Sequence, residues 1–137
     1  MYLLSNAQAV FTWPELEQCG LADCFDDIRL SSDHGVKKPE PSFLAALMHA
    51  QGMDPGETLL IGNDWASDMY IAAANGIAGW FVNSDRLSKA QRLAERRVLE
   101  ARFGAPAAAE IGETGRLSAL LRALERGENN ASEGMTE

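Results

Sequence analysis

The chain has 137 residues, of which 46% are hydrophobic, and its 20 acidic residues outnumber 12 basic ones, for a formal charge of -8. This length and composition suit one α/β domain with its own core. The acidic balance argues against nonspecific binding to nucleic acid or to an anionic membrane, because both need clustered Lys and Arg.

The first forty residues are expected to hold two strands joined by a helix. Residues 2–4 are an apolar strand, too short and too soon interrupted by polar residues to be a signal peptide or a membrane span. Pro14 suits the first turn of a helix that ends at Gly20. Residues 24–31 alternate weakly, as in an edge strand, and residues 32–35 are expected to form a loop.

Two cysteines, Cys19 and Cys24, lie in this part of the chain. They form no Cys-x-x-Cys motif and have no His at metal-ligand spacing. We therefore expect buried, reduced thiols that fill the core of a cytoplasmic protein.

The middle of the chain continues the alternation of helix and strand. Apolar residues recur at helical spacing over 41–52, the run 59–61 has the hydrophobicity of a strand covered on both faces, and 78–82 is a further apolar strand. Between these strands we expect a helix with one face of small residues, closed by Gly76. The pattern predicts an α/β fold with a doubly wound parallel sheet, Rossmann-like in its architecture.

Beyond residue 83 the chain is rich in Arg. Residues 85–102 carry six basic and three acidic residues, which could mark a partner surface or a solvated helix face. The expected buried stripe of this helix consists of Leu87, Ala90, Ala94, Val98 and Ala101. We expect a short edge strand around Ile111, a last amphipathic helix over 116–126, and a disordered acidic tail over 127–137, so that the domain spans 1–126.

Polar residues follow the strands at comparable places. Ser5 and Asn6 follow the first strand, Lys38 precedes a proline after the second, and Asp64 and Asp68 follow the third. Ligands bind at the carboxyl ends of parallel strands, where a hydroxyl and a lysine can hold phosphate and carboxylates can hold Mg²⁺. Taken singly, Ser5 could cap a turn, Lys38 could be a surface lysine and Asp64 could cap the helix it precedes.

This order of motifs resembles the haloacid dehalogenase-like (HAD) hydrolase superfamily from its second motif onward. Residues 2–6 are similar to the second motif, a strand ending in Ser or Thr. Residues 35–41 are similar to the third motif, whose lysine directly before proline corresponds to Lys38. Residues 60–77 are similar to the acidic fourth motif and the helix that follows it.

The resemblance implies roles for the polar residues. Ser5 and Lys38 would be catalytic stabilisers of the phosphoryl group, with Asn6 beside them in the phosphate site. Mg²⁺ would be bound by Asp68 together with either Asn63 or Asp64, because the usual Gly-Asp is here Gly-Asn-Asp and both alignments keep Asp68.

One family motif has no match in these residues. The first motif is an Asp-x-Asp at a strand end that supplies the nucleophile and the general acid/base, and the eight aspartates include no pair two residues apart: they are Asp23, Asp26, Asp27, Asp33, Asp54, Asp64, Asp68 and Asp85. The resemblance implies that the missing strand is the central one of the sheet, and we expect its two neighbours to close up and pair directly. We also expect Mg²⁺ to bind weakly, since the nucleophile carboxylate is one of its family ligands.

The function implied is a Mg²⁺-dependent phosphohydrolase acting on a small phosphorylated metabolite, present as a C-terminal portion that is inactive alone. One alternative is a noncatalytic module that binds a phosphorylated ligand, or a partner protein through the helix at 85–102. Another is a dehalogenase or phosphotransferase of the same superfamily, because the retained motifs do not fix the leaving group.

Overall fold

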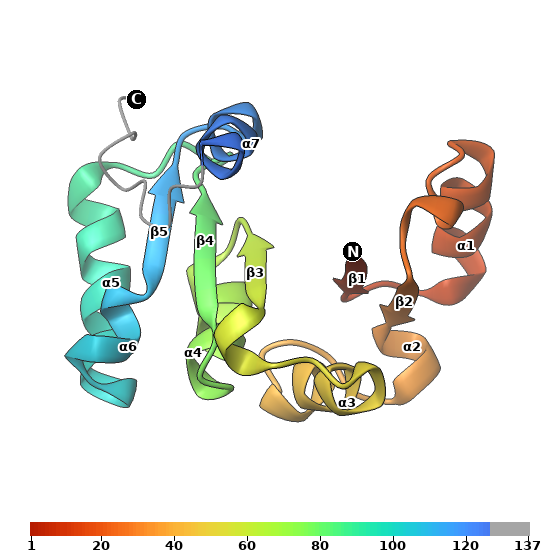
Figure 1. Cartoon of the computed structure of the whole chain (residues 1–137), viewed down its shortest axis with the longest axis horizontal. Coiled ribbons are helices and arrows are strands. Elements are labelled where there is room, and N and C mark those ends of the chain that lie inside the picture. Colours follow the sequence, from red (N-terminus) through yellow and green to blue (C-terminus); the bar gives the residue numbers. More distant parts are fainter. Residues whose placement is uncertain (127–137) are drawn as a thin grey trace. The chain divides into compact units, whose positions relative to one another are not determined.

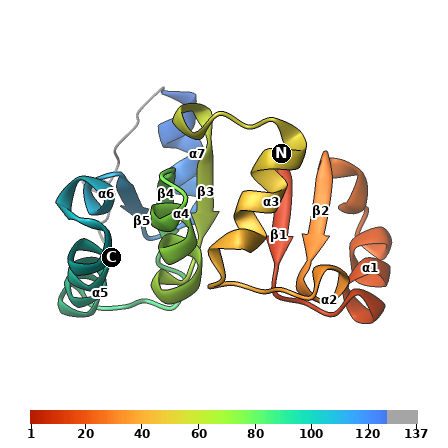
Figure 2. The same cartoon turned by 90° about the horizontal axis from the view of Figure 1, so that it is seen from below.

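The structure, a computed structural model, describes residues 1–126, which fall into two compact units, Met1–Gly52 and a second that begins at Met53 (Figures 1 and 2). Each unit has its own sheet, with strand order β1-β2 in the first and β3-β4-β5 in the second. All three strand pairings are parallel, and helices connect the strands. The predicted parallel α/β class is therefore confirmed.

The first unit pairs two short strands, with Tyr2 opposite Asp27 and Ser5 opposite Leu30. Its elements in chain order are β1 (Tyr2–Ser5), α1 (Ala9–Gln18), η1 (Ala22–Cys24), β2 (Asp27–Leu30), α2 (Ser31–His34) and α3 (Pro41–Gln51). The last of these follows the prediction closely: it begins at a proline, buries one apolar face and ends at Gly52, whose φ is 61°.

A polar contact joins β2 to the end of α3. The Asp27 Oδ2 accepts hydrogen bonds from Arg29 Nε and Gln51 Nε2, each at 3.2 Å. Burial alone would raise the pKa of Asp27, but these hydrogen bonds and the Arg29 charge hold that pKa below its ordinary value of 3.8. The carboxylate is therefore stabilised in its charged form.

Two helical details of the first unit differ from the predictions. Pro14 lies inside α1 rather than in its first turn. The proline leaves the carbonyl of Val10 without its helical partner, and Val10 is 72% exposed, so water can reach that carbonyl. Residues 32–35 are not simply a loop, because α2 occupies most of them and ends at Gly35 in the left-handed conformation.

The predicted burial of the two cysteines is also wrong. Cys19 and Cys24 are free and exposed. The helix α1, which Cys19 caps, has no buried residue, so it presents no inward face for a thiol to fill.

The second unit holds three strands side by side (Figure 1). Its elements are η2 (Pro55–Glu57), β3 (Leu59–Gly62), the π-helical segment η3 (Trp65–Met69), α4 (Tyr70–Ala74), β4 (Ala78–Val82), α5 (Lys89–Phe103), α6 (Ala105–Ala109), β5 (Ile111–Thr114) and α7 (Leu117–Glu125). In both views α6 lies against α5 (Figures 1 and 2).

Consecutive residues of the middle strand, β4, bury their side chains on opposite faces of this sheet. Phe81 belongs to a buried cluster with residues of η3, α5 and β5, namely Trp65, Met69, Leu99 and Ile111. Trp80 packs on the other face with Leu120 and Ala123 of α7. Because side chains alternate along a strand, this arrangement shows that helices cover both faces, as a doubly wound sheet requires.

A glycine of β5 makes room for the larger of these two aromatic side chains. A Cβ atom at Gly112 would lie 2.8 Å from Cε3 of the Trp80 ring. The indole Nε1 of Trp80 donates a buried hydrogen bond of 3.1 Å to Thr114 Oγ1. The indole is thus fixed between β5 and α7.

The helix α5 turns a different face inward from the one predicted. Val98 is 63% exposed, and the buried side is that of Leu99, with Arg92 and Arg96 beside it. The Arg96 Nη2 lies 2.6 Å from Glu113 Oε2, and Arg92 Nε lies 3.2 Å from Oε1 of the same carboxylate. The predicted stripe consists largely of alanines, whereas the inward arginines balance a mostly buried carboxylate from β5.

Arg96 is held by further contacts on this inward side. Its guanidinium stacks over the Trp65 ring at 5.0 Å and donates hydrogen bonds to the carbonyls of Ala108 and Ile111, at 2.6 and 3.1 Å. One arginine side chain therefore links η3, α6 and β5.

One prediction about β3 is wrong. Ile61 is 46% exposed, so β3 is not covered on both faces; it is the edge strand of its sheet, where cover is less complete. The expected direct pairing of β1 with β3 would join the two units and stays a prediction; within the units, β1 pairs with β2 and β3 with β4.

No helix among residues 1–126 has the length and apolar character needed to cross a membrane. The predicted tail at 127–137 lies outside the described residues.

Candidate functional site

The end of β1 is tied to the loop that carries Lys38. The Asn6 side chain donates from Nδ2 to the carbonyl of Lys38 at 3.0 Å, and its Oδ1 accepts the Lys38 backbone N–H at 2.8 Å. Ser5, the last residue of β1, immediately precedes this amide clamp. The structure therefore brings together two of the three residues predicted for phosphate binding and places the third next to them in the chain.

Two serines outside the predicted site support the same strand end. Ser31 Oγ accepts the Ala7 backbone N–H at 3.0 Å and donates to the Ala7 carbonyl at 3.2 Å. Ser32 Oγ accepts the backbone N–H of Ala9 at 2.8 Å. Their signal in the sequence was a pair of serines directly after a strand, where hydroxyls often bond to backbone groups.

The end of β3 is shaped around Asp68. This carboxylate is only 6% exposed, and its Oδ2 accepts the backbone N–H of Asn63 at 3.2 Å. A Cβ atom at Gly62 would lie 2.4 Å from Cβ, Cγ and Oδ2 of Asp68. Glycine at position 62 therefore lets η3 carry Asp68 into contact with the strand end.

Asp64, a predicted metal ligand, caps the helical segment that follows it. Its Oδ1 accepts the Ala66 backbone N–H at 3.1 Å, and its Oδ2 accepts the Ser67 hydroxyl at 2.8 Å, so it caps η3. Asn63 directs its Nδ2 to Ser84 Oγ at 3.2 Å, beyond the end of β4. Binding of a metal ion by Asp64 would use the same carboxylate oxygens that accept these two hydrogen bonds.

The donor set for a metal ion is incomplete in the part of the chain that is described. Residues 1–126 contain no group of three or more His, Cys, Asp or Glu side chains placed to hold an ion. Asp64 and Asp68 offer two carboxylates near one strand end, whereas Mg²⁺ requires octahedral oxygen coordination. These residues alone do not make a complete Mg²⁺ site.

Known proteins resemble this chain in sequence. A family model described as haloacid dehalogenase-like hydrolase matches residues 1–76. A curated relative, glyceraldehyde 3-phosphate phosphatase of Methanothermobacter thermautotrophicus, is 27% identical over 90 residues, which is 66% of this chain and 39% of that protein. The chain thus spans well under half the length of this curated relative.

Solved structures share the fold. A HAD phosphatase from Thermococcus onnurineus superposes with a TM-score of 0.65 at 23% identity, over 93% of this chain and 52% of that one. A HAD-hydrolase from Bacillus subtilis, crystallised bound to magnesium, gives a TM-score of 0.60 at 24% identity, over 64% and 39% of the two chains.

Proposed function

Because the chain belongs to the haloacid dehalogenase-like hydrolase family, we propose that it carries the phosphate-binding part of a Mg²⁺-dependent phosphatase for small phosphorylated metabolites. The curated phosphatase relative supports a phosphatase rather than a dehalogenase. Within this proposal, the substrate class is a phosphate monoester of small size.

The observation that carries the proposal is the clamp between Asn6 and Lys38. Asn6 directly follows Ser5, the last residue of β1. Its two hydrogen bonds to the Lys38 backbone fix the position from which the lysine side chain extends. A lysine ammonium and a strand-end hydroxyl are suited to neutralise and orient a phosphoryl group. Asn6 then acts as a positioning residue, because its amide already bonds to the Lys38 backbone on both its oxygen and its nitrogen side.

Hydrolysis by the family route also needs a carboxylate nucleophile. The 137 residues contain no Asp-x-Asp pair, and Ser5 and Lys38 can bind and polarise a phosphate without offering a covalent route. We therefore propose that these residues have no turnover by themselves and become active when an Asp-x-Asp strand is supplied.

The test compares the chain alone with a fusion that adds an Asp-x-Asp strand segment before Met1, using glyceraldehyde 3-phosphate and p-nitrophenyl phosphate with Mg²⁺. We expect turnover only in the fusion. Lys38→Ala in the fusion should lower kcat about a hundred-fold or more, as expected for loss of an electrostatic stabiliser.

Lys37→Ala is the matched control, because it removes the same charge from the adjacent, exposed residue. Equal losses from the two substitutions would show that only the loop's net charge matters and would refute the assigned role of Lys38. Turnover by the chain alone that survives Lys38→Ala would place the chemistry elsewhere.

Mg²⁺ binding is tested separately by titration calorimetry on the chain alone. We expect weak binding that Asp68→Asn abolishes, because two carboxylates leave most of the octahedral shell to water. Tight binding that persists in this variant would show that other residues hold the ion.

A further inference from the structure

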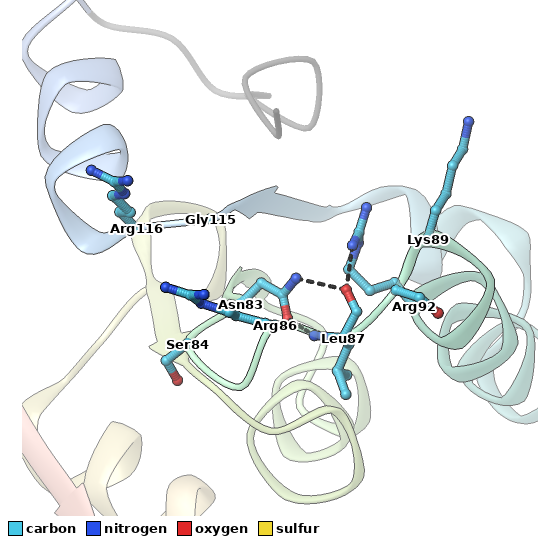
Figure 3. Close-up of a pocket in the computed structure, with 9 residues that line it drawn as sticks. Asn83, Ser84, Arg86, Leu87, Lys89, Arg92, Gly115 and Arg116 are labelled. Atoms are coloured by element: carbon cyan, nitrogen blue, oxygen red, sulfur yellow. Dashed lines mark hydrogen bonds between the residues drawn. The ribbon is translucent and has the colours of Figure 1, made fainter. Parts of the chain in front are cut away.

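A pocket of about 810 Å³ opens at the carboxyl ends of β4 and β5 in the second unit (Figure 3). Among the described residues that line it, four are basic and none is acidic; the basic ones are Arg86, Lys89, Arg92 and Arg116. A volume of this size falls within the range of small-molecule sites in proteins.

The topology explains why the pocket favours anions. Since β4 and β5 are parallel, their carboxyl ends meet at one edge of the sheet, and the helices that follow them, α5 and α7, both begin there. Neither helix has an acidic residue in its first turn, and the residue before α7, Arg116, makes no side-chain capping bond. Two positive helix ends therefore face the same pocket.

A basic residue at the N-terminus of a helix interacts unfavourably with the helix dipole unless an anion lies beside it. Lys89 is the first residue of α5, where a cation opposes the helix dipole. Two acidic residues lie close by, because Arg92 pairs with Glu113 and Asp85 lies next to Arg86 in the chain. Among the described residues, these two acidic residues do not outnumber the four basic side chains of the lining, so the described lining carries more positive than negative charge, beside the two helix ends.

The pocket wall is already ordered. Asn83 is only 4% exposed, donates from Nδ2 to the Leu87 carbonyl at 2.9 Å and accepts the Leu87 N–H at 2.8 Å. The Nη1 of Arg92 donates to the same carbonyl at 2.6 Å (Figure 3). Between these anchors Arg86 has a φ of 56°, a left-handed conformation that is uncommon outside glycine. The loop thus holds Arg86 at the pocket in a defined backbone conformation.

We propose that this pocket is a second anion site, which binds a small molecule carrying phosphate groups. It shares no residue with the phosphate site assigned to Ser5 and Lys38, and it does not depend on the proposed phosphatase activity. Arg86 and Lys89 supply the charge, Ser84 supplies a hydroxyl, and the backbone N–H groups at the two helix ends supply further donors.

The test uses pyrophosphate as the probe and the full chain as the protein. Backbone amide shifts of residues 84–89 are followed by NMR at fixed ionic strength, with potassium chloride exchanged for pyrophosphate and, in a second series, for inorganic phosphate. We expect saturable shifts with pyrophosphate and weaker binding of inorganic phosphate, because a second phosphoryl group reaches more of the donors. The double substitution Arg86→Gln/Lys89→Gln should raise the Kd about tenfold or more.

Arg97→Gln is the matched control, since it removes the same kind of charge from an exposed position of α5 outside the pocket. Its Kd should stay near that of the original chain, and so should the Kd of Lys38→Ala measured on the same amides. Without ligand, Lys89→Gln should leave Tm unchanged or raise it, because it removes an adverse cation from the first turn.

Three results would overturn the proposal. One is the absence of saturable shifts up to about 10 mM pyrophosphate, a concentration that covers even weak small-molecule sites. Another is an equal loss of binding in Arg97→Gln and in the double variant, which would mean that only net charge matters. A clear fall in the ligand-free Tm of Lys89→Gln would assign that lysine to folding rather than to binding.

Discussion

Replacing Gly62 by alanine should disturb the strand end that holds Asp68. The added methyl would lie 2.4 Å from three atoms of Asp68, among them its Cβ, which cannot move unless η3 moves. Such a distance is well inside ordinary contact between carbon atoms, for which the optimum is about 3.5 to 4.0 Å. Either η3 shifts away from β3 or Asp68 leaves its rotamer.

The cost can be bounded from known overpacking effects. Extra methylenes in a close-packed site destabilise by about 1 to 3 kcal/mol. The displaced carboxylate also loses the 3.2 Å hydrogen bond from Asn63 N–H, worth about 1 kcal/mol or more because the acceptor is charged. We expect the free energy of unfolding to fall by roughly 2 to 4 kcal/mol.

Urea denaturation followed by tryptophan fluorescence measures this loss, since Trp65 and Trp80 are both buried in the second unit. Gly56→Ala is the matched control: its added Cβ would meet Asp54 Oδ1 at 3.5 Å, an ordinary contact. This control should change stability by less than about 0.5 kcal/mol.

A double-mutant cycle isolates the steric term. Asp68→Gly removes all three clashing atoms, and its own costs, a helix-segment glycine and a lost hydrogen bond, appear in both the single and the double variant. Gly62→Ala should therefore be nearly harmless in the Asp68→Gly background. An equal penalty in both backgrounds, or no penalty in either, would refute the steric role of Gly62.

Three further substitutions test contacts within each of the two units. Glu113→Gln should cost about 2 to 4 kcal/mol, since it leaves two largely buried arginines without their shared carboxylate; a loss no larger than that of the exposed Glu110→Gln would contradict it. Thr114→Val should cost about 1 to 3 kcal/mol, because the buried indole N–H of Trp80 loses its acceptor, and an unchanged urea midpoint would argue that another acceptor takes over. Asp27 has a lowered pKa in the folded chain, so its contribution to stability is full above pH 3.8 and is lost as pH falls through the folded value. The stability difference between the original chain and Asp27→Asn should shrink over that acidic range, and a difference that grows there would mean the sign is wrong.

The elements that follow from local patterns were predicted well. The helix from Pro41 carries its signals within a few residues: a proline at the start, apolar spacing and a glycine after the end. The strand at 78–82 is a short, continuous apolar run. Lys38 and Asp68 could be proposed because motif order is visible in one dimension. That Asn6 clamps the Lys38 backbone was not visible, since the two residues are 32 positions apart.

The inward face of α5 could not be predicted for a related reason. Arginines on a helix ordinarily face water, and only a carboxylate placed nearby by β5 makes Arg92 and Arg96 the inner side. The position of that carboxylate depends on the pairing of β4 with β5, which helical periodicity does not encode. The same limit applies to the basic pocket, whose residues come from two segments of the chain more than twenty positions apart.

The fit between Gly112 and Trp80 has a consequence for how sequences of this kind vary. The two residues share one volume, because any side chain at 112 would have to occupy space that the indole fills at 2.8 Å. The sizes of the residues at positions 80 and 112 should therefore vary inversely between related chains, with a larger residue at 112 accompanying a smaller one at 80. Such a covarying pair would identify the β4–β5 register in a distant homologue whose motifs alone do not reveal it.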